Sequence, residues 1–227
     1  MFIDMTAPYK PIESFIYDKF IAPAVLELVF SLQEEFLGQI KENAHILDVG
    51  CGGGHMAIHF ASIRRDVIIT GLDLSPEQIT RAKKRAIASK TPVDFIEGSA
   101  LNLPFEDKLF DVVYSSGSIK HWPDPLTGLK ECIRVLKPGG NLLIFETNKK
   151  CVEEDANYFI SKWRLPNFIK TSFLIKQFFL KFVIGRSFTP DDAKELISKI
   201  NNIKNAEIIL IQNTLALLIK ANREENS

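Results

Sequence analysis

The sequence predicts an α/β fold with a mostly parallel central sheet. Short apolar runs typical of buried strands alternate with amphipathic stretches of helical spacing between residues 46 and 145. This alternation indicates a parallel sheet with helices on both faces. Two further strand-like runs, 206–211 and 215–221, are separated by so short a connection that they must form an antiparallel hairpin. We therefore expect a seven-stranded sheet whose last strand is antiparallel.

Composition narrows the classes of function. The 28 Lys and Arg residues balance 28 Asp and Glu residues, so no nucleic-acid partner is expected from net charge. The three cysteines are scattered, which favours a reducing compartment. Met1–Pro11 lacks the cationic start and apolar run of a signal peptide, and the apolar stretch 173–184 is interrupted by Lys176 and Lys181. These features predict a cytoplasmic protein and leave its oligomeric state open.

The first part of the chain is expected to form a helix and then the opening strand. After Pro23, apolar residues recur at helical spacing on one face: Val25, Leu28, Val29, Leu32, Phe36 and Ile40. Ile46–Val49 follows as a short buried strand that carries one acid, Asp48. The glycines after it predict a tight turn into a helix that begins near His55.

The second strand and second helix have clear signals. Residues 67–73 predict a strand that ends on an acid, Asp73. Ser75 is placed to cap the next helix, because Pro76 follows at the first helical position. Gln78 stands where a capping box would be completed.

The strand and helix alternation continues to residue 145. Residues 93–97, 110–114 and 142–145 read as three more strands. Asp124-Pro125 opens the helix between the last two of them, and the run 137–140, Lys-Pro-Gly-Gly, ends it.

After the fifth strand the alternation breaks. Residues 148–188 are rich in Phe and Lys and predict a helical insert, after which Thr189-Pro190 caps one more helix. We expect residues 1–227 to form a single domain, with residues 1–44 as an N-terminal helical cap and residues 148–188 as an insert or lid.

The glycine run 50–54 follows the first strand and leaves backbone N–H groups open to a ligand with an anionic group. A phosphate-binding loop needs Lys and Ser or Thr after the last glycine, where this chain has His55 and Met56. A dinucleotide fingerprint counted from Gly50 needs glycine at His55. Both readings therefore fit poorly, and the spacing Asp48-x-Gly50-x-Gly52-x-Gly54 fits a third family better.

Five stretches of the sequence, which occur in the same order as in that family, support this third interpretation. They are Ile46-Leu47-Asp48-Val49-Gly50-Cys51-Gly52-Gly53-Gly54, Gly71-Leu72-Asp73-Leu74-Ser75, Glu97-Gly98-Ser99-Ala100-Leu101-Asn102-Leu103-Pro104-Phe105, Phe110-Asp111-Val112-Val113-Tyr114-Ser115 and Val135-Leu136-Lys137-Pro138-Gly139-Gly140. With these blocks the chain resembles the class I S-adenosylmethionine-dependent methyltransferases. Within them it is most similar to the broad group that includes ubiquinone, menaquinone and small-molecule methyltransferases. The resemblance covers about His45 to Glu146 and implies a Rossmann-like three-layer sandwich.

The resemblance also implies a cofactor, S-adenosyl-L-methionine, and the residues that hold it. Asp48 corresponds to the acid below the amino group, and Asp73 to the acid that accepts both ribose hydroxyls. Many relatives have aspartate where this chain has Ser99, so recognition of the adenine differs here. The implied cofactor-binding set is Asp48, Gly50, Cys51, Gly52, Gly54, Asp73, Leu74, Ser99, Ala100, Leu101, Ser115 and Ser116.

His121 is the candidate catalytic residue, in a loop that the resemblance places beside the transferable methyl group. It could deprotonate an acceptor, since histidine titrates near neutral pH. It could equally pack beside the cofactor for shape, because methyl transfer can run on positioning alone. No metal is expected: His55 and His59 lack a third ligand, and Asp191-Asp192 is explained as the acidic first turn of a helix.

The implied reaction is transfer of a methyl group from S-adenosylmethionine to a small, hydrophobic organic acceptor. Two alternatives remain open: a non-catalytic S-adenosylmethionine-binding regulator or subunit, and an NAD-dependent oxidoreductase, against which the glycine spacing argues. The insert is either a lid over a hydrophobic acceptor or a helix packed on the N-terminal one. Peripheral membrane contact through residues 158–188 would use Lys170, Lys176 and Lys181.

Overall fold

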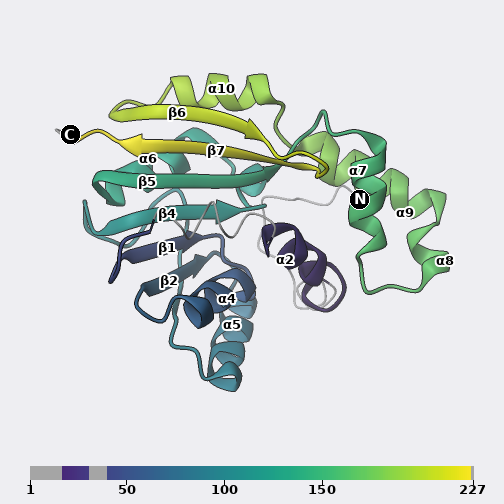
Figure 1. Ribbon diagram of the computed structural model, residues 1–227, viewed down its shortest axis with the longest axis horizontal. Coiled ribbons are helices and arrows are strands. Elements are labelled where there is room, and N and C mark those ends of the chain that lie inside the picture. Colours follow the sequence, from purple (N-terminus) through teal and green to yellow (C-terminus); the bar gives the residue numbers. More distant parts are fainter. Residues whose placement is uncertain (1–16, 31–39, 226–227) are drawn as a thin grey trace.

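The computed structural model describes residues 17–30 and 40–225 and contains one seven-stranded sheet with the order β3-β2-β1-β4-β5-β7-β6 (Figure 1). The strands β1 to β5 run parallel to one another, whereas β7 is antiparallel to both β5 and β6. The seven strands are β1 His45–Val49, β2 Ile68–Asp73, β3 Asp94–Glu97, β4 Phe110–Ser116, β5 Leu136–Thr147, β6 Ile203–Leu210 and β7 Ala216–Arg223. The predicted mostly parallel sheet with an antiparallel last strand is confirmed.

The helices form layers on the two faces of this sheet. Apolar residues of α4 and α5 pack with one face, together with Val25 and Leu26 of α2, and those of α6 and α10 pack with the other. The long helices are α2 Ala22–Phe30, α4 His55–Ile63, α5 Pro76–Ser89, α6 Pro125–Val135, α7 Glu153–Ser161 and α10 Pro190–Ser198. The short ones are η1 Tyr17–Ile21, η2 Ile119–His121, α8 Asn167–Lys170, α9 Phe173–Phe178, η3 Phe179–Val183 and η4 Ile184–Arg186.

The capping predictions hold in part. Ser75 caps α5, because its Oγ accepts a hydrogen bond from the backbone N–H of Gln78 at 3.3 Å. The capping box predicted for this helix is wrong: the Gln78 side chain is buried and makes no hydrogen bond to any described residue. A complete capping box stands instead at α10, where Thr189 and Asp192 bond reciprocally.

Several element limits differ from the sequence prediction. β5 begins at Leu136, directly after α6, and the Lys-Pro-Gly-Gly run becomes an irregularity in its pairing with β4 instead of a loop before the strand. The N-terminal helix α2 already includes Pro23 in its first turn, where a missing N–H does no harm. The predicted continuation of this helix over residues 31–39 lies outside the described residues, and Ile40 is buried in the core beneath α4.

A third, smaller apolar cluster joins the insert to the N-terminal helix. Ala24 of α2, Ile160 and Trp163 of the α7 region, and Phe179 of η3 are buried together. The contact is fixed by polar groups too, since the backbone N–H of Arg164 donates to the Phe20 carbonyl at 3.0 Å. The packing of the insert on the N-terminal helix, one of the two readings of this segment, is therefore present.

Candidate active site

The glycine run forms a turn at the carboxyl end of β1. The backbone N–H groups of Gly50 and Cys51 both donate to the Leu72 carbonyl of β2, at 2.7 and 3.0 Å. Gly50 has a φ of +77°, and a Cβ there would collide with the Ser118 side chain. Gly52 also has a positive φ, but a Cβ there would meet no described atom within 4 Å. Gly50 is thus required by internal packing, whereas Gly52 leaves open space for a ligand.

Gly54 is required for a third reason. A Cβ at this position would press on the ring of Phe95 and on Ala82. Gly54 therefore lets the start of α4 pack closely on β3 and α5, and it lies away from the open side of the turn. Of the three glycines at alternate positions, Gly52 is the one that opens to a ligand.

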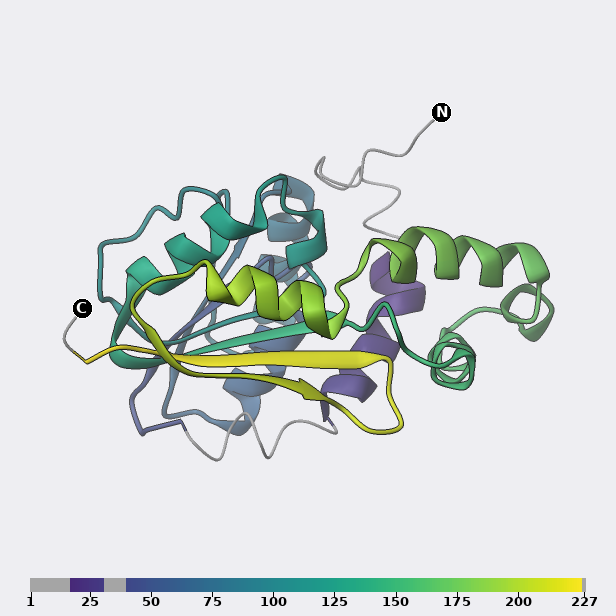
Figure 2. The ribbon, with the colours of Figure 1, turned by 90° about the horizontal axis from the view of Figure 1, so that it is seen from above.

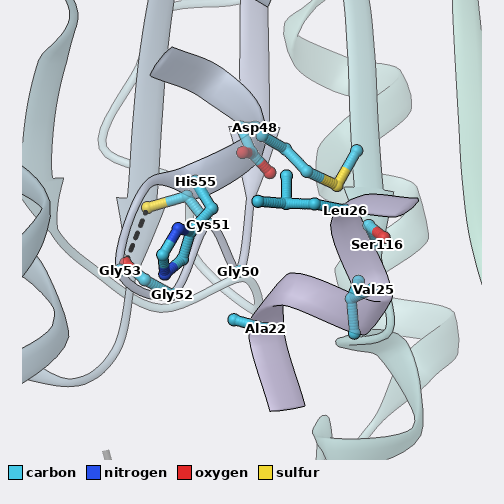
Figure 3. Close-up of a pocket in the computed structure, with 11 residues that line it drawn as sticks. Ala22, Val25, Leu26, Asp48, Gly50, Cys51, Gly52, Gly53, His55 and Ser116 are labelled. Atoms are coloured by element: carbon cyan, nitrogen blue, oxygen red, sulfur yellow. Dashed lines mark hydrogen bonds between the residues drawn. The ribbon is translucent and has the colours of Figure 1, made fainter. Parts of the chain in front are cut away.

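A pocket lies between this turn and α2 (Figure 3). Three residues of α2 face the glycine turn across it, and the side chain of Leu26 extends toward Asp48 (Figure 3). The lining residues are Ala22, Val25, Leu26, Asp48, Gly50, Cys51, Gly52, Gly53, His55, Met56 and Ser116. Five of the predicted cofactor-binding residues thus meet in one pocket: Asp48, Gly50, Cys51, Gly52 and Ser116.

Asp48 forms the buried polar floor of this pocket. Its Oδ2 accepts a hydrogen bond from the Tyr114 hydroxyl at 2.8 Å. Burial raises the pKa of Asp48 from 3.8 to about 7; the Tyr114 hydrogen bond opposes the rise and the nearby charge of Asp73 adds to it. Sequence reasoning missed Tyr114 as a site residue. The signal was available in the register, because Asp48 and Tyr114 are direct partners in the β1–β4 pairing.

Asp73 connects the glycine turn to the start of α5. Its Oδ2 accepts from the backbone N–H of Gly52 at 2.8 Å, and its Oδ1 from that of Ser75 at 2.9 Å. Burial raises the pKa of Asp73 despite these two hydrogen bonds. Each carboxylate oxygen still has a second acceptor site, so the group can receive further donors from a ligand.

The predicted adenine region lies next to Asp73 along the sheet edge. The backbone N–H of Gly98 donates to the Asp73 carbonyl at 3.0 Å, which brings the end of β3 beside the end of β2. Ser99 begins a tight turn in which its Oγ accepts from the Leu101 N–H at 3.1 Å. Ala100 and Leu101 are half-buried, and Leu74 is exposed. These residues do not line the pocket beside α2, which corresponds to the opposite end of the site.

The two serines at the end of β4 lie in different environments. Ser116 lines the pocket, whereas Ser115 is fully buried and its Oγ has no hydrogen-bond partner among the described residues. His121 ends η2 and is half-buried, with its backbone N–H bonded to the Ser118 carbonyl at 2.9 Å. It is not among the pocket-lining residues.

Sequence reasoning also missed a buried ion pair between the ends of β4 and β5. The Lys120 Nζ donates to both carboxylate oxygens of Glu146 at 2.9 Å and to the Gly117 carbonyl at 3.1 Å. Both side chains are almost fully buried. The pair holds the turn after β4 against β5, and this turn carries Ser118, which fills the space beside Gly50, and leads into His121.

Comparisons with known proteins agree with this arrangement. Residues 47–144 match a family described as "Methyltransferase domain". Over 109 residues the chain is 38% identical to the 27-O-demethylrifamycin SV methyltransferase of Amycolatopsis mediterranei, a match that covers 46% of this chain and 39% of that protein. Over 166 residues it is 31% identical to the chloroplastic 2-phytyl-1,4-beta-naphthoquinone methyltransferase of Arabidopsis thaliana, covering 69% of this chain and 63% of that protein.

The chain therefore spans less than two thirds of the length of these two relatives. Its fold is similar to the crystal structure of a SAM-dependent methyltransferase from Aquifex aeolicus, with a TM-score of 0.71 and 17% sequence identity. That match covers 95% of this chain and 99% of the other, so the likeness of fold extends through the insert and the C-terminal hairpin.

The buried Asp48 predicts a pH-dependent stability. Because its pKa is raised from 3.8 to about 7, the folded protein holds a proton between these values that the unfolded chain releases. The free energy of unfolding should therefore fall as the pH rises through this window, by at most about 4 kcal/mol at 1.36 kcal/mol per pKa unit. Asp48→Asn, which does not titrate, should lack this fall when urea unfolding is followed across the window.

Tyr114→Phe is the matched second variant for this test. This variant removes the hydrogen bond that favours the ionised carboxylate and so raises the pKa of Asp48 in the folded protein. The decrease in the free energy of unfolding should therefore extend to higher pH. Superimposable pH profiles for the wild-type protein and Asp48→Asn would mean that Asp48 stays ionised, and the assignment of its raised pKa would be wrong.

The buried ion pair predicts strong coupling between Lys120 and Glu146. Either Glu146→Leu or Lys120→Met alone leaves one buried charge uncompensated, which should lower the free energy of unfolding by about 3–5 kcal/mol. The double variant Lys120→Met/Glu146→Leu should lose less than either single variant, because no charge remains buried. Glu195→Gln, which breaks the exposed Lys199–Glu195 pair, should cost less than about 1 kcal/mol as the control. Additive effects at 120 and 146 in urea unfolding would contradict this coupling.

Proposed function

We propose that this chain is a class I S-adenosylmethionine-dependent methyltransferase and transfers a methyl group from S-adenosyl-L-methionine to a small, hydrophobic organic acceptor; the match of residues 47–144 to a methyltransferase domain supports this. One observation carries the proposal: two carboxylates, the buried Asp48 and the half-buried Asp73, flank the open space beside Gly52, whose N–H already donates to Asp73. An amino acid joined to a nucleoside presents a cationic amino group and a ribose diol, and these are the groups that two such carboxylates bind best.

The residues of the site fit this cofactor. Asp48 would face its amino group, since a cation beside it favours the charged carboxylate. Asp73 would accept the ribose hydroxyls while it keeps its bonds to Gly52 and Ser75. Ser99 and Ala100, with Leu74 and Leu101 as apolar walls, would hold the adenine. The glycine turn, with Cys51, Ser115 and Ser116, completes the set; the N–H groups of Gly50, Cys51, Gly52 and Gly54, expected to be open to a ligand, donate within the protein instead.

The cofactor supplies a methyl group on a sulfonium, and the chain supplies alignment and a dry site. The turn after β4, held by Lys120 and Glu146, would set the position of His121. We place His121 as the base that takes a proton from an acceptor hydroxyl or amine. The segments 1–44 and 148–188 would cover the acceptor side as cap and lid of a single domain, 1–227.

The relatives support a small apolar acceptor. Two of the relatives are named as methyltransferases of a demethylrifamycin and of a phytyl naphthoquinone. Acceptors of this class dissolve in membranes, so peripheral membrane contact through residues 158–188 belongs to this proposal. The protein would act in the cytoplasm, without a nucleic-acid partner.

The cofactor assignment is tested by binding. Asp73→Asn should weaken S-adenosylmethionine by roughly 10- to 100-fold in isothermal titration, because hydrogen bonds to a charged group contribute about 1.5–3 kcal/mol. Asp94→Asn, an exposed acid at the far end of the neighbouring strand, is the control and should bind as the wild-type protein does. Unchanged affinity in Asp73→Asn, with folding verified by circular dichroism, would refute the placement of the ribose.

Turnover separates an enzyme from a binding subunit. Tight cofactor binding without methyl release on any acceptor of a quinone and polyphenol panel would favour the non-catalytic alternative. Stabilisation by NAD instead of S-adenosylmethionine would favour the oxidoreductase.

The role of His121 is tested by kinetics. If it is the base, His121→Asn should lower kcat by about 10²-fold or more, leave the Kd of S-adenosylmethionine unchanged, and abolish the acidic limb of the kcat–pH profile. His59→Asn, at a partly exposed position on α4, is the matched control. A parallel drop at every pH, or no drop, would assign His121 to packing.

A further inference from the structure

The tip of the insert exposes three large apolar side chains at neighbouring positions. Phe168 lies in α8 and is 76% exposed, while Phe173 and Leu174 begin α9 and are 72% and 76% exposed. The inward side of the insert is filled by other residues, among them Trp163 and Phe179, in the cluster shared with α2. The three tip residues are therefore not needed for the packing of the insert.

The tip also lies apart from the sheet. Figures 1 and 2 both show α8 and α9 projecting at the end of the molecule opposite the C-terminus. The body of the insert is anchored to α2, for example by the Lys162–Glu27 ion pair at 2.5 Å. This anchoring leaves the tip facing outward instead of over the glycine turn.

The insert is strongly basic, although the chain as a whole is neutral. Between Asp155 and Asp191 the sequence contains no Asp or Glu and six Lys or Arg: Lys162, Arg164, Lys170, Lys176, Lys181 and Arg186. The formal charge of this segment is +6. Since the chain sums to zero, the remainder carries −6. Charge is thus separated along the sequence, and the segment keeps an excess of positive charge when the Lys162–Glu27 ion pair is taken into account.

We propose that the α8–α9 tip docks on the surface of an anionic lipid bilayer. Phe168, Phe173 and Leu174 enter the interfacial layer, and the surrounding cations attract the negative headgroups. Docking would give the proposed enzyme access to an acceptor dissolved in the bilayer. Only this purpose of the contact rests on the proposed function. Among the described residues no helix is long and apolar enough to cross a membrane, so the contact is peripheral.

The structure changes which residues carry this contact. Lys170, one of the three lysines expected to touch headgroups, donates its Nζ to the Ser161 carbonyl at 2.8 Å. Its ammonium is thus held against the insert. The apolar tip therefore supplies insertion, and the cations supply attraction that is spread over the segment. A second copy of the chain is a poor occupant, because a symmetric contact would bring two +6 segments together.

The test is co-sedimentation of the full chain with vesicles of phosphatidylcholine alone and with added phosphatidylserine. The wild-type protein should bind the anionic vesicles, more weakly as salt rises. The triple variant Phe168→Ser/Phe173→Ser/Leu174→Ser should bind them roughly tenfold less or weaker still. Ile87→Ser, which changes an equally exposed apolar side chain on α5, should bind as the wild-type protein does.

Three outcomes would overturn the proposal: no binding of the wild-type protein to anionic vesicles, equal binding by the triple variant, or a self-association in size-exclusion chromatography that the triple variant abolishes. Cofactor titration of the same variants separates this result from the proposed function. The triple variant should keep the Kd of S-adenosylmethionine and turnover of a water-soluble acceptor. If the protein binds vesicles but transfers no methyl group, the docking proposal is supported and the proposed methyltransferase activity is refuted.

Discussion

The carboxylate of Asp73 holds together the parts of the site that come from different elements. Through its two oxygens it fixes the backbone of Gly52, at the end of β1, against that of Ser75, at the start of α5. The pairing of β2 with β1 and β3 places this group between the carboxyl ends of those two strands. The open glycine turn, the predicted adenine region and α5 therefore have a common reference point. Parallel sheets bind ligands at this edge because the loops of neighbouring strands converge there.

Two buried carboxylates at the same edge of the sheet, those of Asp48 and Glu146, have different partners. Asp48 has a hydroxyl partner but forms no ion pair with any residue that the structure describes, and burial raises its pKa to about 7. Glu146 is equally buried but meets the Lys120 ammonium with both oxygens. The first arrangement leaves a carboxylate that gains a counter-charge when a cationic ligand binds. The second is complete without a ligand, and so it serves to hold the turn between β4 and η2.

The features that could be predicted from the sequence are those determined by residues close to one another in the chain. The alternation of strands and helices along the chain, the Ser75 cap, the helix start at Asp124-Pro125 and the C-terminal hairpin follow from short windows of residues, and the structure confirms them. The roles of Gly50 and Gly54 could not be read in this way, because Ser118 and Phe95, which fill the adjacent space, are distant in sequence. The same holds for Tyr114 and for the Lys120–Glu146 pair, whose meeting depends on strand register and on the return of the loop after β4.

The helix α2 packs both against the pocket beside the glycine turn and against the insert. Val25 and Leu26 form a wall of the pocket, with Asp48 behind it. On its other side, Ala24 and Leu28 pack into the cluster of the insert, with Ala24 beside Trp163 and Phe179. The same helix therefore contacts both the pocket beside the glycine turn and the segment with the basic, apolar tip. Because packed side chains shift together, the position of the insert and the shape of the pocket wall are not independent. A bilayer that holds the tip acts on the same helix that closes over the glycine turn.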